Sequence, residues 1–181
     1  MNKALYFFVL LAMVFAGAGC SKNSEDVKSA ADVADNKLVT QSFDVSGLDL
    51  EKIDINRDGK TDQRVYSKEG VVLYVVRDLN FDDKTDMTEF YDESGMHVRD
   101  EIDLDYDGIC DLIVTYENEI PVKKEFSVDF EGNRHGVQYF DSKGERTKID
   151  HDYDADGNVD VVEYYNPKES EPYKVDDLRK K

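Results

Sequence analysis

The sequence contains no tryptophan, only three prolines, two cysteines and three histidines among its 181 residues. It is also poor in positive charge, because 23 basic residues stand against 41 acidic ones and leave a net charge of −18. This balance excludes the basic footprint on which nucleic-acid binding depends, so we expect no nucleic-acid partner. The scarcity of proline excludes a collagen-like chain. No apolar run of 18 or more residues follows residue 20, which excludes a transmembrane body.

What the chain does contain is charge and aromatic rings. Its 11 tyrosines and 9 phenylalanines are too many for a simple acidic disordered tail. A charged content of 35% and a mean hydropathy of −0.64 nevertheless allow only a thin hydrophobic core. The length suits one domain or one short repeat array.

Residues 1–19 have the pattern of a secretory signal. A positively charged start is followed by an apolar run of 13 residues (4–16), the length of a signal peptide's core rather than of a membrane span. The segment Ala16-Gly17-Ala18-Gly19-Cys20 resembles the lipobox of bacterial lipoproteins, which implies cleavage before Cys20 and lipidation of that residue. Gly17 departs from the aliphatic residue usual in the family, and cleavage as an ordinary signal peptide is the alternative.

The same resemblance implies a location. Ser21 rather than aspartate follows the cysteine, which implies an outer-membrane protein whose body faces the periplasm or the cell surface. We expect residues 20–40 to be the lipidated cysteine and a flexible tether, and residues 41–53 to be a first strand or cap. With Cys20 lipidated, Cys110 has no intrachain partner, so it is either a small buried hydrophobic residue or the site of an intermolecular disulfide.

The body of the chain, residues 54–168, repeats itself. Five units start at residues 54, 78, 103, 127 and 152, with spacings of 24 or 25 residues. Each unit consists of a nine-residue acidic loop, a strand-like run with aromatics, a short turn and a second strand-like run. We therefore predict an all-β fold, an antiparallel β-hairpin repeat array that forms a meander or spiral, with EF-hand-like calcium loops between the hairpins. Residues 169–181 are expected to fray.

The acidic loops carry the candidate chemistry. Numbered 1 to 9 within each loop, the positions 1, 3, 5 and 9 hold aspartate or asparagine in four of the five loops, and position 6 is glycine in four. Calcium prefers six to eight oxygen ligands, and side chains at alternate positions of a tight loop converge on one point. The candidate ligands are Asp54, Asn56, Asp58 and Asp62 in loop one; Asp78, Asn80, Asp82, Asp86 and Glu89 in loop two; Asp103, Asp105, Asp107 and Asp111 in loop three; and Asp152, Asp154, Asp156, Asp160 and Glu163 in loop five.

The loops differ in how completely they match. Glu89 and Glu163 stand at position 12, where a bidentate carboxylate closes an EF-hand site. Loop four (127–135) is degenerate, with Ser127 at position 1 and His135 at position 9. The alternative is that all five are acidic turns that bond to their own backbone. Seventeen of the 41 acids lie in these loops, and so much like charge favours three to five bound Ca²⁺ ions.

The loop pattern resembles the calcium loops of dockerins, thrombospondin type 3 repeats and integrin FG-GAP blades. Two helices do not fit between consecutive loops, so a helix-loop-helix EF-hand is disfavoured. The sequence lacks G-x-S-x-G, H-E-x-x-H and P-loop motifs, and its three histidines fall at unequal repeat positions, so we predict no enzymatic activity.

The lipobox followed by these repeats also resembles the repeat lipoproteins of myxobacteria, some of them associated with adventurous gliding motility. This implies a calcium-binding, membrane-anchored scaffold or adhesion component of the cell envelope, with a protein or polysaccharide partner. The alternative is a calcium-dependent module for cell-wall or other polysaccharide. Its candidate partner-binding rings are Tyr66, Tyr91, Tyr116, Phe140 and Tyr165.

Overall fold

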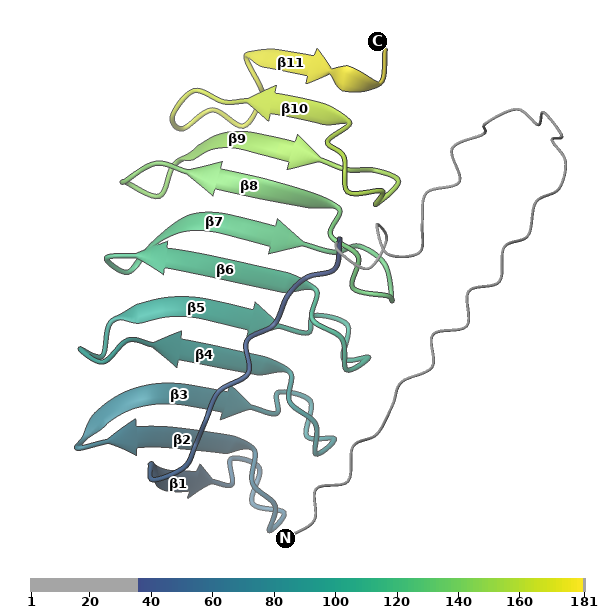
Figure 1. Cartoon of the computed structure of the whole chain (residues 1–181). Coiled ribbons are helices and arrows are strands. Elements are labelled where there is room, and N and C mark those ends of the chain that lie inside the picture. Colours follow the sequence, from purple (N-terminus) through teal and green to yellow (C-terminus); the bar gives the residue numbers. More distant parts are fainter. Residues whose placement is uncertain (1–35, 181) are drawn as a thin grey trace, which may run out of the picture.

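The computed structural model describes residues 36–180, and these residues form one antiparallel sheet whose eleven strands follow the order of the sequence (Figure 1). The all-β hairpin meander predicted from the sequence is therefore confirmed. The strands are β1 (Asp49–Ile53), β2 (Gln63–Lys68), β3 (Val71–Arg77), β4 (Met87–Tyr91), β5 (His97–Ile102), β6 (Leu112–Glu117), β7 (Ile120–Phe126), β8 (Gly136–Phe140), β9 (Arg146–His151), β10 (Val161–Tyr164) and β11 (Lys174–Asp177).

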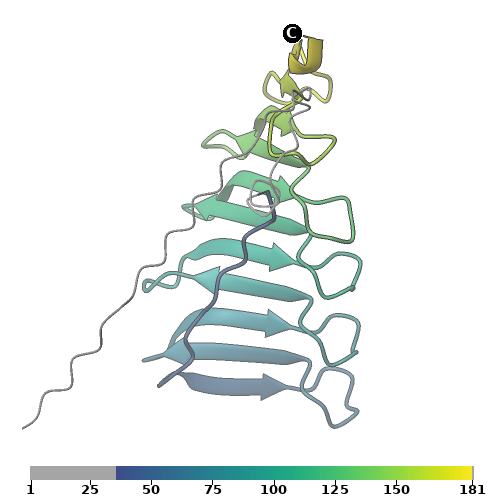
Figure 2. The same cartoon turned by 45° about the vertical axis from the view of Figure 1, so that its right-hand side comes forward.

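The strands end at two opposite sides of the sheet, and these two sides, which we call edges, are unlike. The tight hairpin turns between β2 and β3, β4 and β5, β6 and β7, and β8 and β9 lie along one edge, and the five acidic loops lie along the other (Figures 1 and 2). Gly70, Gly95 and Gly144 take the left-handed backbone that three of these turns require. Each of the four hairpins shifts register near its turn, a β-bulge that recurs at the same place. The repeat is thus structural as well as sequential.

One face of the sheet is crossed by the chain that precedes β1. Residues 36–48, which we name the strap, run diagonally over the strands from the loop edge toward β1 (Figure 1). Phe43 of the strap stacks on Tyr74 with 4.6 Å between ring centroids and meets the edges of Tyr66 and Phe90. Gln41 donates its backbone N–H to Glu101 at 2.7 Å. The strap therefore covers the β2–β5 half of this face, which we call the strap face.

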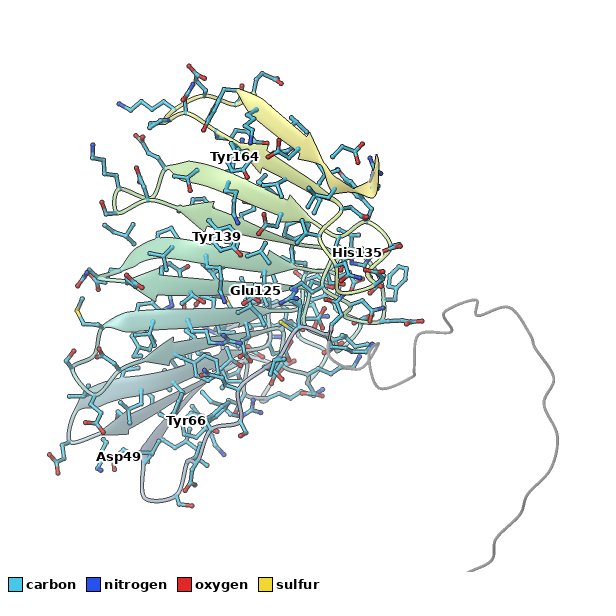
Figure 3. All side chains as sticks on the ribbon, turned by 45° about the horizontal axis from the view of Figure 1, so that its top comes forward. Asp49, Tyr66, Glu125, His135, Tyr139 and Tyr164 are labelled. Atoms are coloured by element: carbon cyan, nitrogen blue, oxygen red, sulfur yellow. The ribbon has the colours of Figure 1, made fainter. Side chains whose placement is uncertain are left out.

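The other half of the strap face has no such cover and is built differently. Residues that face each other across strands project from the same face, and the register aligns them in a row of alternating lysines and tyrosines. Lys148 lies 4.2 Å from the ring centre of Tyr139, and Lys174 lies 4.6 Å from that of Tyr164. Figure 3 labels Tyr66, Tyr139 and Tyr164 along this face. Long side chains here shield the single layer in place of the strap. The row runs Lys123, Tyr139, Lys148, Tyr164 and Lys174.

The hydrophobic core is thin, as the composition predicts. The buried apolar residues are branched aliphatic side chains and two aromatic rings, and they are distributed over both faces. On the strap face they are Val76, Phe90, Ile113 and Val137, and on the opposite face Val75, Val114, Ile149, Val161 and Tyr165. A single layer can bury these side chains because the longer side chains of neighbouring strands fold over them.

Two expected boundaries are corrected. Within the predicted tether and cap, residues 36–48 are the docked strap and only Asp49–Ile53 is a strand. Residues 1–35, with the predicted signal and Cys20, lie outside the described residues. The C-terminal segment does not fray as expected, because β11 pairs with β10 and is followed by the short 3-10 helix η1 (Leu178–Lys180). Leu178 also donates its backbone N–H to Asp160 at 2.8 Å, which ties this segment to loop five.

In the part of the chain that the structure describes, no helix has the length and apolar character needed to cross a membrane.

Candidate metal-binding loops

All five loops share one backbone frame. In each, the N–H at position 9 bonds to the carbonyl just before position 1, as Asp86 does to Arg77 at 2.8 Å. The N–H of the first residue of the next loop then bonds to the carbonyl at position 9, as Asp103 does to Asp86 at 2.8 Å. Consecutive loops are therefore stacked on one another along the edge, and a constant loop length keeps them in register.

The carboxylates at positions 1 and 9 hold this frame from inside. In loop two, Asp78 accepts the N–H groups of Phe81 at 2.7 Å and Asp83 at 2.8 Å. Asp86 accepts those of Leu79 at 2.6 Å and Asn80 at 3.1 Å. Both carboxylates are buried. The alternative reading, that the loops are turns bonded to their own backbone, thus describes what these two acids do, because N–H donors compensate their desolvation.

Two positions of the frame require a left-handed backbone. Position 6 is one of them, and glycine stands there in loops one, three, four and five, as expected from the sequence. Position 4 is the other, where Arg57, Phe81, Tyr106 and Ala155 have φ values of 55–66°. Sequence reasoning missed position 4, because none of these residues signals a left-handed conformation.

Loops three and five each bring three carboxylates together. The oxygens of Asp103, Asp105 and Asp111, and separately those of Asp152, Asp154 and Asp156, lie within 4.8 Å of one another. Desolvation raises the pKa of Asp105 and of Asp154, and repulsion from neighbouring aspartates in the same loop raises both further. These acidic clusters can hold a metal ion. A hard cation with oxygen ligands fits the donor set best.

The remaining candidate acids of these two loops lie in the frame but outside the clusters. Asp107 accepts the N–H groups of Ile109 at 2.8 Å, and Asp160 accepts that of Tyr153 at 2.9 Å. They help to shape the loops around the clustered oxygens.

Loops one and two keep the frame but not the acid cluster. Asparagine replaces aspartate at position 3, where the amide of Asn56 donates to Asp58 at 3.1 Å. Lysine stands at position 7: Lys60 pairs with Asp83 of loop two, and Lys84 lies 3.6 Å from Asp82. Hydrogen bonds from the backbone of these lysines lower the pKa of Asp58 and of Asp82. The candidate ligands of loops one and two therefore have neighbouring donors and cations supplied by the protein itself. They are Asp54, Asn56, Asp58, Asp62, Asp78, Asn80, Asp82 and Asp86.

The glutamates at position 12, which the sequence predicts to close two of the sites, lie in strands and contact other side chains. Glu89 lies within β4, where it accepts from Arg77 at 2.8 Å. Glu163 lies within β10 and accepts from Tyr165 at 2.6 Å, with His151 at 3.2 Å. In an EF-hand the chain turns into a helix after position 9, whereas here it continues as an extended strand. Position 12 then lies within a strand, and the acid clusters of loops three and five do not include it.

Loop four differs from the other loops because it binds the beginning of the strap. Asn36 donates from its side chain to the carbonyl of Arg134 and to Asp152, both at 3.1 Å, and Leu38 donates its N–H to Gly132 at 2.9 Å. Lys37 forms a β-bridge with Asn133. The beginning of the strap thus lies against loop four and contacts loop five. The sequence shows the degeneracy of loop four but not this contact, which joins residues about 95 positions apart.

The acid of loop four is satisfied within the loop. Burial raises the pKa of Asp129, but hydrogen bonds from the side chain and backbone of Asn133 and from the N–H of Glu131 outweigh it and bring this pKa to about 2. His135 lies 3.7 Å from the same carboxylate.

The five candidate partner-binding rings are all engaged by other side chains. Tyr66 meets Phe43, Tyr91 and Tyr116 flank His97 with centroid distances of 5.1 and 4.2 Å, Lys124 covers Phe140, and Arg146 lies 3.8 Å from the ring centre of Tyr165. Tyr116 also donates its hydroxyl to the buried Asp100 at 2.7 Å. These rings stabilise the sheet, and their faces are largely occupied.

Cys110 occupies position 8 of loop three. Its side chain is half-buried, and burial raises the pKa of the thiol. The small-hydrophobe interpretation of this residue agrees with that environment.

No protein-family model matches the chain. A comparison with curated proteins gives no match either.

Several solved structures are similar in part. The accessory secretory protein 1, 2 and 3 structure from Streptococcus pneumoniae aligns with a TM-score of 0.43 and 11% identity over 71% of this chain and 23% of that chain. The glycosylation associate protein complex from Streptococcus agalactiae gives 0.34 and 15% over 77% and 24%. The GtfA/B complex bound to UDP and GlcNAc gives 0.28 and 9% over 74% and 24%. The chain spans about a quarter of each, and likeness at these scores supports no statement about function.

Proposed function

We propose that this protein is a non-enzymatic, calcium-binding lipoprotein that serves as a scaffold or adhesion component of the cell envelope. Calcium binds at loops three and five. The lipid on Cys20 holds the protein at the outer membrane, and the sheet presents its faces and edges to a protein or polysaccharide partner. A role in motility follows only from the sequence resemblance.

One observation carries the calcium assignment: two loops of the same frame each gather three carboxylates within 4.8 Å. Among the described residues these are the groups of three or more potential metal-ligating side chains, and both fall in loops that the sequence singles out. Desolvation, and after it repulsion from neighbouring aspartates, raises the pKa of Asp105 and of Asp154, and a bound cation relieves such repulsion. Two ions, rather than the three to five that the sequence suggests, are the number that this arrangement supports.

The ion also has a structural consequence. A single-layer sheet with a thin core has a small free energy of unfolding. An ion that binds only the folded state increases this free energy by mass action. Because the loops are stacked on one another, ions in loops three and five stabilise the whole loop edge.

Calcium titration calorimetry on residues 21–181, paired with a thermal melt in calcium and in chelator, tests the proposal. This segment contains all eleven strands of the part of the chain that the structure describes. We expect about two sites and a melting temperature that rises with calcium. The matched control is the double variant Asp105→Asn, Asp154→Asn, which keeps the frame acids at positions 1 and 9. Absence of heat together with an unchanged melt contradicts the proposal.

Lipidation needs a separate test. Mass spectrometry of the protein from its native membrane is expected to find an acylated N-terminal fragment beginning at Cys20, and the Cys20→Ser variant is expected to lose both the acyl mass and membrane retention. A mature N-terminus elsewhere, without acyl mass, overturns this part of the proposal.

A further inference from the structure

The loop edge exposes a row of apolar side chains. Position 2 is apolar or aromatic in all five loops, and position 4 is aromatic in three consecutive loops. We name these eight residues the apolar stripe: Ile55, Leu79, Leu104, Val128, Tyr153, Phe81, Tyr106 and Phe130. Each is between 42% and 76% exposed, with Phe130 at 76% and Val128 at 74%. Figures 1 and 2 show these loops projecting side by side from one edge of the sheet.

Within the stripe Tyr153 has ring contacts of its own, with His151 at 5.2 Å between ring centroids and with Arg179 at 5.5 Å from its ring centre. Position 4 has a left-handed backbone, where a bulky side chain is unfavourable, yet Phe81 and Tyr106 both stand there at φ 66°. Their exposure means that they gain little from packing. In a chain with a net charge of −18, a row of exposed apolar side chains at equivalent positions points to a contact outside the fold.

We propose that the apolar stripe docks on the surface of an anionic lipid bilayer, with calcium in loops three and five bridging the acidic loops to lipid phosphates. This inference rests on the proposed calcium function. The aromatic and aliphatic side chains enter the interfacial layer, where such residues are stabilised. Without calcium, the carboxylates of the same loops repel an anionic surface, so docking depends on the ion.

The form of the stripe favours a bilayer over a protein partner. The apolar residues stand on separate projecting loops, and polar residues, most of them acids, occupy positions 1, 3 and 5 beside them. Neighbouring loops are two strands apart, so their tips are spaced by about 10 Å. A protein interface has a continuous buried apolar core, whereas a row of separate tips suits a fluid layer that closes around each one.

The path of the chain supports the same orientation. The strap enters the described fold at Asn36, which is 2% exposed and bonded to loops four and five on the loop edge. Fifteen residues, 21–35, separate it from Cys20. They span at most about 50 Å, so the proposed lipid anchor keeps the loop edge within reach of the bilayer.

Vesicle flotation of unlipidated residues 21–181 tests this inference. The vesicles contain either phosphatidylcholine alone or equal parts of phosphatidylcholine and phosphatidylglycerol, and each is used in calcium and in chelator. We expect flotation only with the anionic vesicles in calcium. The triple variant Phe81→Ser, Tyr106→Ser, Phe130→Ser is expected to bind them with an affinity reduced by about ten-fold or more. Its heat of calcium binding is expected to be unchanged.

The matched control replaces three apolar residues of similar exposure elsewhere, Val39→Ser, Leu50→Ser and Val175→Ser, and is expected to float like the parent. Because the chain has no tryptophan, a Phe130→Trp variant adds a direct reading, an emission shift to shorter wavelength on binding.

The outcomes separate the two proposals. Calcium heat without flotation overturns docking and leaves calcium binding intact, and so does an equal loss of flotation in the control variant. Flotation on neutral vesicles in chelator also overturns the calcium bridge. Absence of both calcium heat and flotation overturns both proposals.

Discussion

Loops three and five differ from loops one and two in chemistry but not in backbone. All four place aspartates at positions 1 and 9, take a left-handed conformation at positions 4 and 6, and close with the same hydrogen bonds. Loops three and five then add an aspartate at position 3 and no lysine at position 7, and three carboxylates meet. Loops one and two have asparagine and lysine at those positions, and backbone hydrogen bonds from the lysines lower the pKa of Asp58 and of Asp82.

The comparison separates two roles that the D-x-D-x-D-G pattern mixes. Positions 1, 6 and 9 build the frame, because they satisfy backbone donors or permit the turn. Positions 3 and 7 decide the charge that the frame encloses. A repeat protein can therefore keep its stacked edge through all units and restrict ion binding to some of them.

The largest effect is expected at position 9. Asp86→Ala leaves the N–H groups of Leu79 and Asn80 without their acceptor and is expected to destabilise the fold by about 2–4 kcal/mol. This loss is the same in calcium and in chelator, because loop two has no acid cluster. Asp111→Ala in loop three removes the same frame bond and also a clustered oxygen, so its cost is expected to rise in calcium. Urea unfolding of both variants, each with and without calcium, measures the difference, and equal calcium dependence contradicts the assignment.

At position 3, a substitution is expected to change the melting temperature in opposite directions in chelator and in calcium. Asp105→Asn removes a charge that repels its neighbours, so in chelator the variant is expected to melt slightly higher than the parent. In calcium it melts lower, because loop three binds calcium on the order of ten-fold to a hundred-fold more weakly. Thermal melts in the two conditions check this, with Asp154→Asn as the counterpart in loop five. A variant that melts lower in both conditions shows that Asp105 serves the frame alone.

Loop two is expected to gain an ion when it is given the chemistry of loop three. The double variant Asn80→Asp, Lys84→Ile supplies the missing aspartate and removes the position-7 lysine, while the frame stays as it is. Calorimetry is expected to show about three sites in place of two, the new one weak. Asn80→Asp alone, which keeps the lysine, is the control and is expected to bind much less tightly than the double variant. No additional heat from the double variant means that the frame of loop two is itself unsuited to calcium.

The smallest effect is expected in loop four, where Asn133→Ala removes the side-chain donor of Asp129. The pKa of this carboxyl is then expected to rise from about 2 toward its ordinary value. Because the folded-state pKa lies below the unfolded one, its contribution to stability is present above the unfolded pKa and is lost as the pH falls toward about 2. The variant is expected to lose only a small part of that contribution, because the Asp129 side chain is 31% exposed and solvent screens its interactions. Carboxyl carbon NMR titration measures the shift, and an unchanged pKa would show that backbone donors alone lower it.

The repeat, the hairpins and the loop edge are predictable from the sequence because they are local. A turn residue acts on its own backbone, and strand pairing between neighbours follows from short connections. The glycines at position 6 are visible for the same reason. Position 4 stays hidden, because the four residues that are left-handed there, Arg57, Phe81, Tyr106 and Ala155, share no side-chain type that signals this conformation.

The features that sequence reasoning misjudged all depend on distant contacts. Position 12 resembles an EF-hand ligand until the extended strand carries Glu163 to His151 and Tyr165. Residues 36–48, which the sequence assigns to the tether and cap, form the strap because Phe43 packs against rings on β2, β3 and β4. The C-terminal segment pairs with β10 because that strand otherwise presents an unpaired edge.

The sequence by itself determines the period, the strand and loop alternation and the acids available at each loop, since all of these are set by neighbours along the chain. Only the tertiary structure decides which acids converge, which half of the strap face is covered, and which loop receives the strap. The position of the strap depends on contacts between residues remote in sequence, and the convergence of the acids depends on the three-dimensional course of each nine-residue loop, which a count of charges does not give.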